Sequence, residues 1–372
     1  MLVLAVNSGS TSVKLAAYSS PDGGATLVRV GYAHVSGAAL DPRATLAGFS
    51  AKLDGPVAAV AHRVVHGGTQ FVRPTLVDAS VESSLAGLSE LAPLHNPVAL
   101  DWIAAARSAC SGEARQIAVF DTAFFAELPR VAHEYALPSS LGSELGVRRY
   151  GFHGLAHEAM WRRWCELHPE HPCGGRLITL QLGGGCSIAA IAAGRPLDTS
   201  MGFSPLEGLV MATRCGDLDP SAVAYLAQKL HASPDHIVER LNREAGLLGV
   251  SGSTGDMQQL ARERHDAAEF AIDLYCYRAR KYVGAYLAVL GGCDGVVFGG
   301  GVGEHMPQIR ERILASLRWA GITLDVRANE AARGAEARIS PADAGIAIWV
   351  IPVDEELALA KAAFTLASPQ RS

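Results

Sequence analysis

Short apolar runs alternate along this chain with longer segments in which apolar residues recur at helical spacing. The runs are rich in Val, Ile and Leu and predict β-strands at Leu2–Val6, Ala58–Arg63, Gln116–Phe120, Leu177–Leu182, Gly295–Phe298 and Ile346–Ile351. The helical spacing predicts helices at Asn96–Ser108, Pro220–Lys229, Asp266–Leu290, Met306–Ala320 and Asp354–Leu366. Such an alternation is typical of an α/β protein.

Two stretches about 175 positions apart share one pattern of strand, small-residue turn and strand. They read "LVLAVNSGSTSVKLAAYS" near the start and "LITLQLGGGCSIAAIAAGRPLDTS" in the second half. Each turn alone is explained equally well by an ordinary hairpin or by a loop whose backbone N–H groups hold a phosphate. A third glycine cluster, "VVFGGGVGEH", follows a predicted strand and precedes a predicted helix. Together they favour an internally duplicated fold with a phosphate-handling cleft between its halves.

Composition and charge narrow the class of protein. A chain of 372 residues with 49% hydrophobic and 19% charged residues is typical of a soluble globular protein of about two domains. A net charge of −5 gives no reason to expect nucleic acid or an anionic membrane as a partner. The seven cysteines are scattered and form no C-x-x-C pair, which argues against a disulfide framework and a zinc site. With no secretory or membrane segment predicted, we expect a cytoplasmic protein.

Arginine and histidine occur in unusual places, within glycine-flanked stretches of low charge. Arg63 and His66 lie in "AHRVVHGG", His153 lies in "RRYGFHG", and Arg214 lies in "MATRCGDLD". A single Arg is most often a solvated surface charge, but guanidinium groups also bind carboxylate and phosphate oxygens. Motifs of P-loop enzymes, protein kinases and serine hydrolases are absent from the sequence.

At this point a family resemblance becomes visible. The segments "VNSGSTSVK", "AHRVVHGG", "LAPLHNP", "VFDTAF", "RRYGFHG", "DTSMGFSPLEGLVMATRCGDLDPS", "GVGEH" and "DEELALA" resemble, in order and spacing, those of acetate kinases. The resemblance implies a duplicated actin/hexokinase-like (ribonuclease H-like) α/β fold with the active site in the cleft between two domains. It also implies an N-terminal domain of residues 1–148 plus 355–372, and a C-terminal domain of residues 149–354 that carries the nucleotide site.

The resemblance implies Mg²⁺-dependent transfer of the γ-phosphoryl group of ATP to acetate, with Mn²⁺ as a possible substitute for Mg²⁺. Asn7 and Glu355 would help to hold the metal, and Asp121 would orient the reacting group. Arg63 and Arg214 would grip the carboxylate and the transferring phosphoryl group. His153 would donate to that group in the transition state, supported by His95. The methyl pocket would be formed by Val65, Leu94, Phe152 and Pro205.

The implied nucleotide site draws on both halves of the chain. Its residues would be Ser10, Ser12, Lys14, Gly183, Gly184, Gly185, Asp256, Met257, Gln258, Gly301, Val302 and His305. Three of its loops depart from the family pattern. The loop "QLGGG" has Gln181 and Gly184 where His and Asn are usual, "GDMQQ" has Gln258 in place of Arg, and "GVGEH" has His305 in place of Asn.

Elementary chemistry agrees with a carboxylate acceptor. Such an acid, with a pKa near 4–5, is already ionised at neutral pH and needs no general base. The difficulty is to bring one anion to another, and two Arg, one His, one Lys and Mg²⁺ address it by charge neutralisation.

The sequence is also compatible with other substrates and with another class of protein. The acceptor could be propionate or butyrate, and the departures leave room for pyrophosphate or another nucleotide as donor. In a different class, a non-catalytic nucleotide-binding regulator or filament-forming relative would need the phosphate loops but not Arg63, His153 and Arg214. We also expect a homodimer with acetate and ATP as its small-molecule partners.

Overall fold

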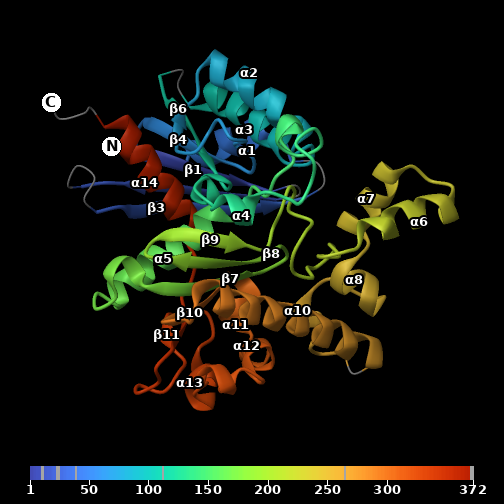
Figure 1. The fold of residues 1–372 in the computed structure, drawn as a ribbon. Helices are drawn as coiled ribbons and strands as arrows, with labels where there is room; N and C mark the ends of the chain where they lie inside the picture. The colour runs from blue at the N-terminus through green and yellow to red at the C-terminus, as the bar shows by residue number, and fades with distance from the viewer. Residues whose placement is uncertain (10–11, 22–25, 38–39, 111–112, 264, 369–372) are drawn as a thin grey trace. The chain divides into compact units, whose positions relative to one another are not determined.

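The chain folds into two compact units, shown in the computed structural model of Figure 1. The structure describes residues 1–368 except 10–11, 22–25, 38–39, 111–112 and 264. Unit 1 comprises Met1–Ala126, Phe152–Leu155 and Asp354–Ser372, and unit 2 comprises Glu127–Gly151 and Ala156–Val353. Residues 127–148, which the sequence-based boundaries place in the first domain, thus cluster with unit 2.

Unit 1 is built on a six-stranded sheet with the strand order β3-β2-β1-β4-β6-β5. The strands β1, β2 and β3 pair antiparallel, β1, β4 and β6 pair parallel, and β5 runs antiparallel to β6. Their bounds are β1 Leu2–Ser8, β2 Ser12–Ser19, β3 Val28–Ser36, β4 Val57–Val64, β5 Thr75–Leu76 and β6 Arg115–Phe120.

Unit 2 repeats this sheet strand for strand. Its order β9-β8-β7-β10-β12-β11 has the same alternation of antiparallel and parallel pairs. The bounds are β7 Arg176–Leu182, β8 Cys186–Ala192, β9 Arg195–Thr199, β10 Gly295–Gly299, β11 Ala337–Arg338 and β12 Ala347–Val350. The predicted duplication and both predicted hairpins are therefore confirmed.

Both faces of the unit 1 sheet are covered by helices, which explains why its strands are continuous apolar runs. Leu4 and Val6 of β1 pack with Trp102 of α3 in one core, together with side chains of α1. Val3 and Ala5 point to the opposite face, where they pack against α14. Successive side chains of a strand alternate between its faces, so one strand supplies both cores. The helices of this unit are α1 Pro42–Ser50, α2 Ala79–Gly87, α3 Asn96–Ala109 and α14 Glu355–Ala367.

The remaining helices belong wholly or mostly to unit 2. They are α4 Arg130–His133, α5 Gly154–Leu167, α6 Pro220–Leu230, α7 Pro234–Arg243, α8 Gly246–Ser251, α9 Met257–Leu260, α10 Asp266–Leu290, α11 Gly300–His305, α12 Pro307–Leu314 and α13 Val326–Ala331. Short 3-10 turns lie at Leu88–Glu90, Ala123–Phe125, Ser143–Leu145, Pro172–Gly174 and Arg318–Ala320. Within the part of the chain that the structure describes, no helix has the length and apolarity required to cross a bilayer.

Two helices are exchanged between the units. α5 follows the strands of unit 1 in the sequence, yet its His157 bonds Thr179 of β7 and Ser187 of β8. α14 follows the last strand of unit 2 but packs on β1 and β4 of unit 1. The red α14 accordingly lies beside the blue N-terminal strands in Figure 1. Glu355, in the last helix of the chain, therefore lies against the sheet that contains β1, the first strand.

One predicted helix was wrong in extent. The segment predicted as a helix over Met306–Ala320 forms α12 and a separate 3-10 turn at Arg318–Ala320, and the glycine cluster before it forms its own short helix, α11. Pro307 is the reason for the break between α11 and α12. Its ring disfavours helical geometry at the preceding residue, and Met306 is accordingly non-helical, with φ −118° and ψ 83°.

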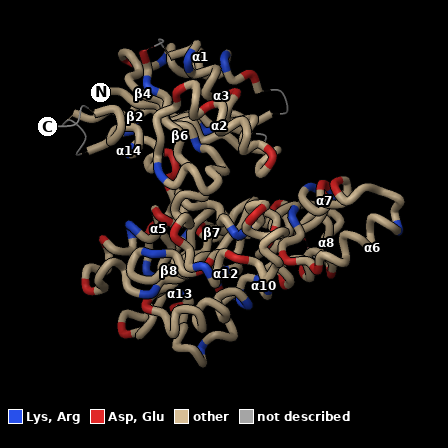
Figure 2. The backbone as a smooth tube through the Cα atoms, turned by 45° about the horizontal axis from the view of Figure 1, so that its top comes forward, with Lys and Arg blue, Asp and Glu red and all other residues tan. Residues whose placement is uncertain are grey.

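Charged residues are distributed over both units. Figure 2 shows Lys and Arg interspersed with Asp and Glu along the backbone of each unit. This mixture agrees with the small net charge of −5.

Candidate active site

A cluster of charged and polar side chains lies at one edge of the unit 1 sheet, where three parallel strands end. Asn7 is next to last in β1, Arg63 is next to last in β4, and Asp121 directly follows β6. The strands β1, β4 and β6 are neighbours in that order. In α/β sheets, the carboxyl ends of parallel strands are the usual place for a ligand site.

Arg63 and Asp121 form the centre of this cluster. The Arg63 Nε donates to Asp121 Oδ1 and Oδ2 at 3.1 and 3.0 Å, and its Nη2 donates to Oδ2 at 2.5 Å. Only 15% of the Arg63 side chain and 1% of the Asp121 side chain are exposed. Burial alone would lower the pKa of Arg63, but the charges of Asp121, Glu355 and Glu356 outweigh it and raise that pKa. Arg63 is therefore a fixed cation.

Asp121 is a fully buried carboxyl group. Burial raises its pKa, and the adjacent guanidinium of Arg63 opposes that rise. Its backbone carbonyl accepts a hydrogen bond from the Gly154 N–H at 2.8 Å. This approach needs a glycine, because a Cβ at position 154 would lie 2.2 Å from the Asp121 oxygen. The loop after β6 and the start of α5 are thereby joined.

Asn7 connects the strand cluster to α14. Its Nδ2 donates to Glu355 Oε2 at 2.8 Å and to Glu356 Oε1 at 2.7 Å, while its Oδ1 accepts from Arg63 Nη1 at 3.3 Å. These contacts bring the carboxylate oxygens of Glu355 and Glu356 next to the Asn7 amide, and oxygen atoms are the ligands that Mg²⁺ prefers in proteins. The donor set of Asn7 and Glu355 therefore fits the predicted metal. Glu356, which is only 5% exposed, was missed in the sequence.

His153 lies in a strained turn directly before α5. Its φ of 59° is in the left-handed region, which is uncommon for residues other than glycine and is concentrated at functional sites. The preceding Phe152 is 1% exposed and meets the His66 ring edge-on, with the ring centroids 5.5 Å apart. Phe152 thus fixes the backbone that presents His153.

Hydrogen bonds hold the loop after β4, on which Val65 lies. Asn96 accepts from the His66 N–H at 3.1 Å and donates to the His66 carbonyl at 3.0 Å. The Gly67 N–H donates to Thr122 Oγ1 at 3.0 Å, which ties this loop to the residue after Asp121. Asn96 and Thr122 are supports that the sequence interpretation missed. They follow His95 and Asp121 directly, and this adjacency was the available signal.

The structure also places the remaining predicted residues of unit 1. Val65 is 6% exposed, whereas Leu94 is 41% exposed. His95 is the residue before α3. Ser12 begins β2, and Lys14 pairs in register with Asn7 across the hairpin. Ser10 lies outside the described residues.

In unit 2, three predicted loops meet around Ala212. The Ala212 N–H donates to the Gly184 carbonyl at 3.1 Å, which links it to the hairpin turn of Gly183–Gly185. Gly255 packs so closely against Ala212 that a Cβ there would lie 2.7 Å from the Ala212 oxygen. Arg214, two residues further, donates to the Pro205 carbonyl at 2.9 Å. Two predicted substrate residues are therefore in contact.

The loop around Asp256 has a structural role of its own. Asp256 caps α9 by accepting from the backbone N–H groups of Gln258 at 2.7 Å and of Gln259 at 3.0 Å. Met257 is 4% exposed and belongs to the core, whereas the Gln258 side chain is exposed. Near the end of β7, the Gln181 Oε1 is buried and has no hydrogen-bond partner among the described residues.

The glycine turn after β10 is fixed by Glu304. Its Oε1 accepts from the Gly300 N–H at 2.9 Å and from the Val353 N–H at 3.1 Å. Gly300 has a φ of +74°, and a Cβ there would lie 2.6 Å from the Leu182 oxygen. Gly301, by contrast, is exposed, and a Cβ added to it would meet nothing within 4 Å. The next predicted residues are Val302, which is half-buried, and His305, whose Nδ1 lies 3.1 Å from the Gly301 carbonyl oxygen.

Arg310 supports the same turn and was missed in the sequence. It is fully buried, and it donates to the carbonyls of Gly303, Asn329 and Ala332 at 2.7–2.8 Å. Burial lowers the pKa of Arg310 to about 10, so the group is still charged at neutral pH. In the sequence, Arg310 is one charged residue in an amphipathic helical pattern, which does not indicate a buried supporting role.

Comparisons with known proteins agree with this geometry. The sequence matches the model of the Acetokinase family over residues 44–361. It is 47% identical to the acetate kinase of Solibacter usitatus over 82% of this chain and 75% of that protein, and 45% identical to that of Clavibacter michiganensis over 85% and 83%.

Solved structures agree as well. The fold matches the Porphyromonas gingivalis acetate kinase with a TM-score of 0.87 and 35% identity, over 99% of this chain and 100% of that one. It matches a propionate kinase from Francisella tularensis with a TM-score of 0.87 and 32% identity, over 98% and 99%. A protein with this duplicated α/β fold and these matches over most of its length belongs to the acetokinase family.

Proposed function

We propose that this protein transfers the γ-phosphoryl group of ATP to acetate, giving acetyl phosphate and ADP, as a phosphotransferase with a carboxyl group as acceptor. The observation that supports this most is the cluster of Asn7, Arg63, Asp121 and Glu355 at the carboxyl ends of β1, β4 and β6 in a chain of the acetokinase family. The cluster combines a fixed cation with oxygen ligands for a metal, as transfer between two anions requires.

The reaction needs positioning and charge neutralisation rather than proton transfer. An acetate oxygen attacks the γ-phosphorus while the bond to the bridging oxygen of ADP breaks, and the electron pair leaves with ADP. Acetate is already ionised at neutral pH, so no base has to remove a proton. Because no base is needed, Asp121 does not have to accept a proton, and both of its oxygens can accept hydrogen bonds from the Arg63 guanidinium.

In this proposal Asp121 acts as a positioning residue. It holds the Nε and Nη2 edge of Arg63, and Asn7 accepts from Nη1, so that the planar guanidinium has one orientation. A guanidinium with a fixed orientation can bind a carboxylate or phosphoryl oxygen without reorganising during the reaction. Arg214 and His153 are assigned the complementary roles of binding the phosphoryl oxygens.

Asn7 and Glu355 would hold Mg²⁺, since their oxygens fit its preference. When bound, Mg²⁺ neutralises phosphate charge and orients the phosphates. The Asn7 amide also donates to Glu356. This hydrogen bond holds the start of α14 against β1, where the metal would bind.

The acceptor is proposed to be acetate, with propionate as a second candidate because a propionate kinase shares this fold with a TM-score of 0.87. Val65 is assigned to the methyl pocket, where one methylene is worth about 1–3 kcal/mol. We expect Val65→Ala to raise the kcat/KM for propionate relative to acetate. A wild-type enzyme that already prefers butyrate would contradict this pocket assignment.

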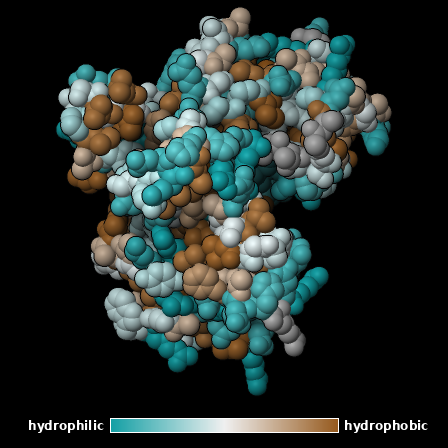
Figure 3. All heavy atoms as spheres, turned by 90° about the vertical axis from the view of Figure 1, so that its right-hand side faces the viewer, coloured by the Kyte–Doolittle hydropathy of each residue, from teal (hydrophilic) through white to brown (hydrophobic). Residues whose placement is uncertain are grey.

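We further propose a homodimer. Large hydrophobic side chains are exposed on unit 2, including Tyr225 and Leu230 of α6 and Phe270 and Tyr277 of α10, each more than half exposed. Figure 3 shows hydrophobic patches among hydrophilic residues on one face of the molecule. Light scattering during gel filtration measures the oligomeric state, and a monomer at micromolar concentration would contradict the proposal.

The function is tested by trapping acyl phosphates with hydroxylamine. Acetate, propionate and butyrate are each assayed with ATP, GTP and pyrophosphate, with and without Mg²⁺. We expect the highest kcat/KM for acetate with ATP, and no turnover after metal chelation. Turnover with pyrophosphate but not ATP would overturn the donor, and absence of transfer to any of these acids would overturn the function.

A further inference from the structure

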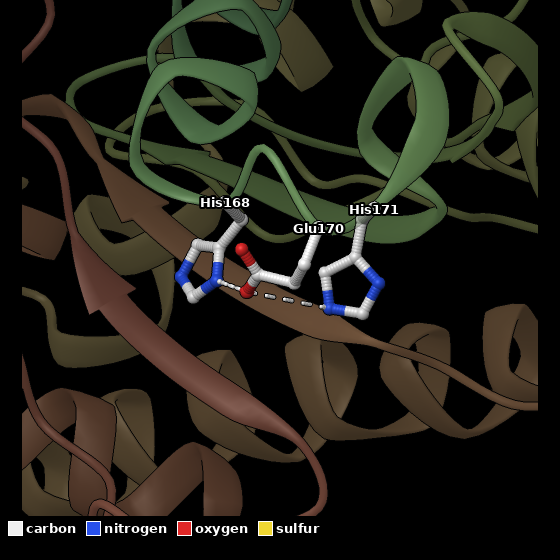
Figure 4. Close-up of side chains that lie close together, drawn as sticks. All are labelled: His168, Glu170 and His171. Carbon is white, nitrogen blue, oxygen red and sulfur yellow. Dashed lines mark hydrogen bonds and ion pairs between the residues drawn. The ribbon is translucent and has the colours of Figure 1, made fainter.

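A second group of potential metal ligands lies in unit 2, in the segment "HPEHPCGG" after α5. Figure 4 shows the side chains of His168, Glu170 and His171 directed toward one another. The His168 Nδ1 lies 2.7 Å from Glu170 Oε1, and the His171 Nε2 lies 4.0 Å from the same oxygen. The three ligand atoms all lie within 4.8 Å of one another.

His168 is the buried member of this group. Only 9% of its side chain is exposed, and its ring stacks on Trp164 with the centroids 3.9 Å apart. Trp349 of β12 meets the same ring edge-on at 5.7 Å. Its Nε2 is buried and has no hydrogen-bond partner among the described residues. Packing on two sides thus fixes the direction in which Nδ1 points.

The backbone of the segment is also held in place. The His171 N–H donates to the His168 carbonyl at 3.1 Å, which closes a turn between the two imidazoles. The indole N–H of Trp164 donates to the Gly174 carbonyl at 2.9 Å. Pro169 and Pro172 restrict φ on either side of Glu170 and His171. Little backbone freedom is therefore lost when a ligand binds here.

We infer that His168, Glu170 and His171 bind a divalent transition metal of the Zn²⁺ class, with the fourth position open to water. Two imidazoles and one carboxylate are typical ligands of Zn²⁺, whereas Mg²⁺ prefers oxygen ligands alone. Tetrahedral bonds of about 2.0–2.1 Å place ligand atoms about 3.3 Å apart. The 2.7 Å separation must widen and the 4.0 Å separation must shrink, each by less than about 1 Å. The separation of the two imidazole nitrogens, which is at most 4.8 Å, must shrink by no more than about 1.5 Å.

The exposed side chains can make that adjustment. The Glu170 side chain is 60% exposed and that of His171 is 33% exposed, so both can rotate while His168 stays fixed. The cysteine spacing, which argued against a zinc site, has no bearing on this one because its ligands are His and Glu. The metal would join the end of α5 to the Pro172–Gly174 turn and stabilise unit 2.

The binding test uses the full-length protein without nucleotide, freed of metal by a chelator. Zn²⁺ is titrated in competition with a colorimetric zinc indicator, in the presence of excess Mg²⁺. Co²⁺ is used in parallel, because its visible absorption reports tetrahedral coordination. The variants are His171→Ala, at a half-buried position, and Glu170→Gln, at an exposed position. The matched control is His236→Ala, an exposed histidine of α7 in the same unit.

We expect one Zn²⁺ per chain that excess Mg²⁺ does not displace. Its Kd should rise at least tenfold in His171→Ala and in Glu170→Gln and should stay unchanged in His236→Ala, and the Co²⁺ absorption should follow the same order. Zn²⁺ should raise the Tm of the wild-type protein but not that of His171→Ala. Equal affinity of wild type and His171→Ala, or equal loss in His236→Ala, would overturn the site.

Discussion

At the scale of single residues, the buried pair of Arg63 and Asp121 is informative because such pairs are not an efficient source of stability. Desolvation of two charges offsets much of their attraction, whereas removal of one partner costs about 3–5 kcal/mol. The pair is better explained by orientation. Both oxygens of Asp121 and the Oδ1 of Asn7 accept from the same guanidinium, which fixes its plane.

The first prediction concerns Arg63 and its counterpart Arg214. Replacement of either by Ala should lower kcat by at least about 100-fold, the scale for loss of one transition-state donor. Arg63→Ala should also lower the Tm, because Asp121 is left buried without its partner. Steady-state kinetics are measured on variants whose circular dichroism matches the wild type. Arg115→Ala, at the exposed start of β6, is the control and should retain activity. A loss below tenfold would remove that arginine from the site.

The second prediction concerns His62 in β4, next to Arg63. Burial lowers the pKa of His62 from 6.5 to about 4, so the ring is neutral in the folded protein. Between pH 6.5 and 4 the unfolded chain binds more protons than the folded one. The free energy of unfolding is therefore highest, as far as His62 is concerned, above pH 6.5, where the ring is neutral in both states. It decreases as the pH falls toward 4.

This pH dependence is measured from urea unfolding midpoints between pH 7.5 and 4.5. As the pH is lowered, the free energy of unfolding should fall less steeply in His62→Gln than in the wild type. The two slopes should differ by up to about 1.4 kcal/mol per pH unit. His231→Gln, an exposed position, should retain the wild-type slope. Parallel profiles for wild type and His62→Gln would show that His62 does not titrate in this window.

At the scale of elements, most residues of the proposed site lie at the ends of strands and in the turns that follow them. The turn from β10 into α11 shows how two adjacent glycines serve different purposes. Gly300 is required by the fold, since its φ is +74° and the Leu182 oxygen lies against it. Gly301 is not required by the fold, because its Cβ position is open.

This contrast leads to the third prediction. Gly300→Ala should lower the Tm, because the added Cβ cannot be accommodated without moving backbone. Gly301→Ala should leave the Tm unchanged but raise the KM for ATP several-fold, if the nucleotide approaches the backbone there. Thermal unfolding and ATP kinetics are compared for both variants. An unchanged KM for ATP in Gly301→Ala would move the proposed nucleotide site away from this turn.

At the scale of the whole molecule, the departures from the family pattern all lie in one unit. Asn7, Arg63 and Asp121 belong to unit 1, and the departures from the family pattern, such as Gly184 and Gln258, belong to unit 2. Changes at Gly184 and Gln258, which are proposed to contact the nucleotide, should affect the donor without affecting the acceptor.

The fourth prediction follows from this separation. Gln258→Arg introduces a cation at an exposed position of α9, between the buried Met257 and Leu260, and a hydrogen bond to a charged group contributes about 1.5–3 kcal/mol. Allowing for solvent exposure, the KM for ATP should fall by up to roughly tenfold, while the KM for acetate stays constant. Gln259→Arg, at the adjacent exposed position, is the control. Equal changes in both KM values would contradict the separation.

Local pattern was sufficient to predict much of this protein. Buried strands such as β1 and β4 appear as apolar runs because both of their faces are covered, and Asn96–Ser108 and Asp266–Leu290 were found by their helical spacing. Motifs and order were enough to identify the family, and most predicted site residues lie at strand ends or in turns. The roles assigned to those residues stay predictions.

Contacts between distant segments were decided only by the tertiary structure. Asn7 meets Glu355 across 348 positions, and Arg63 meets Asp121 across 58. Neither the Glu356 contact nor the support from Arg310 has a local signature, and the segment predicted as one helix over Met306–Ala320 ends its α-helix at Leu314. Periodicity records which face of an element is buried. It does not record which element buries that face, because this depends on packing among all elements at once.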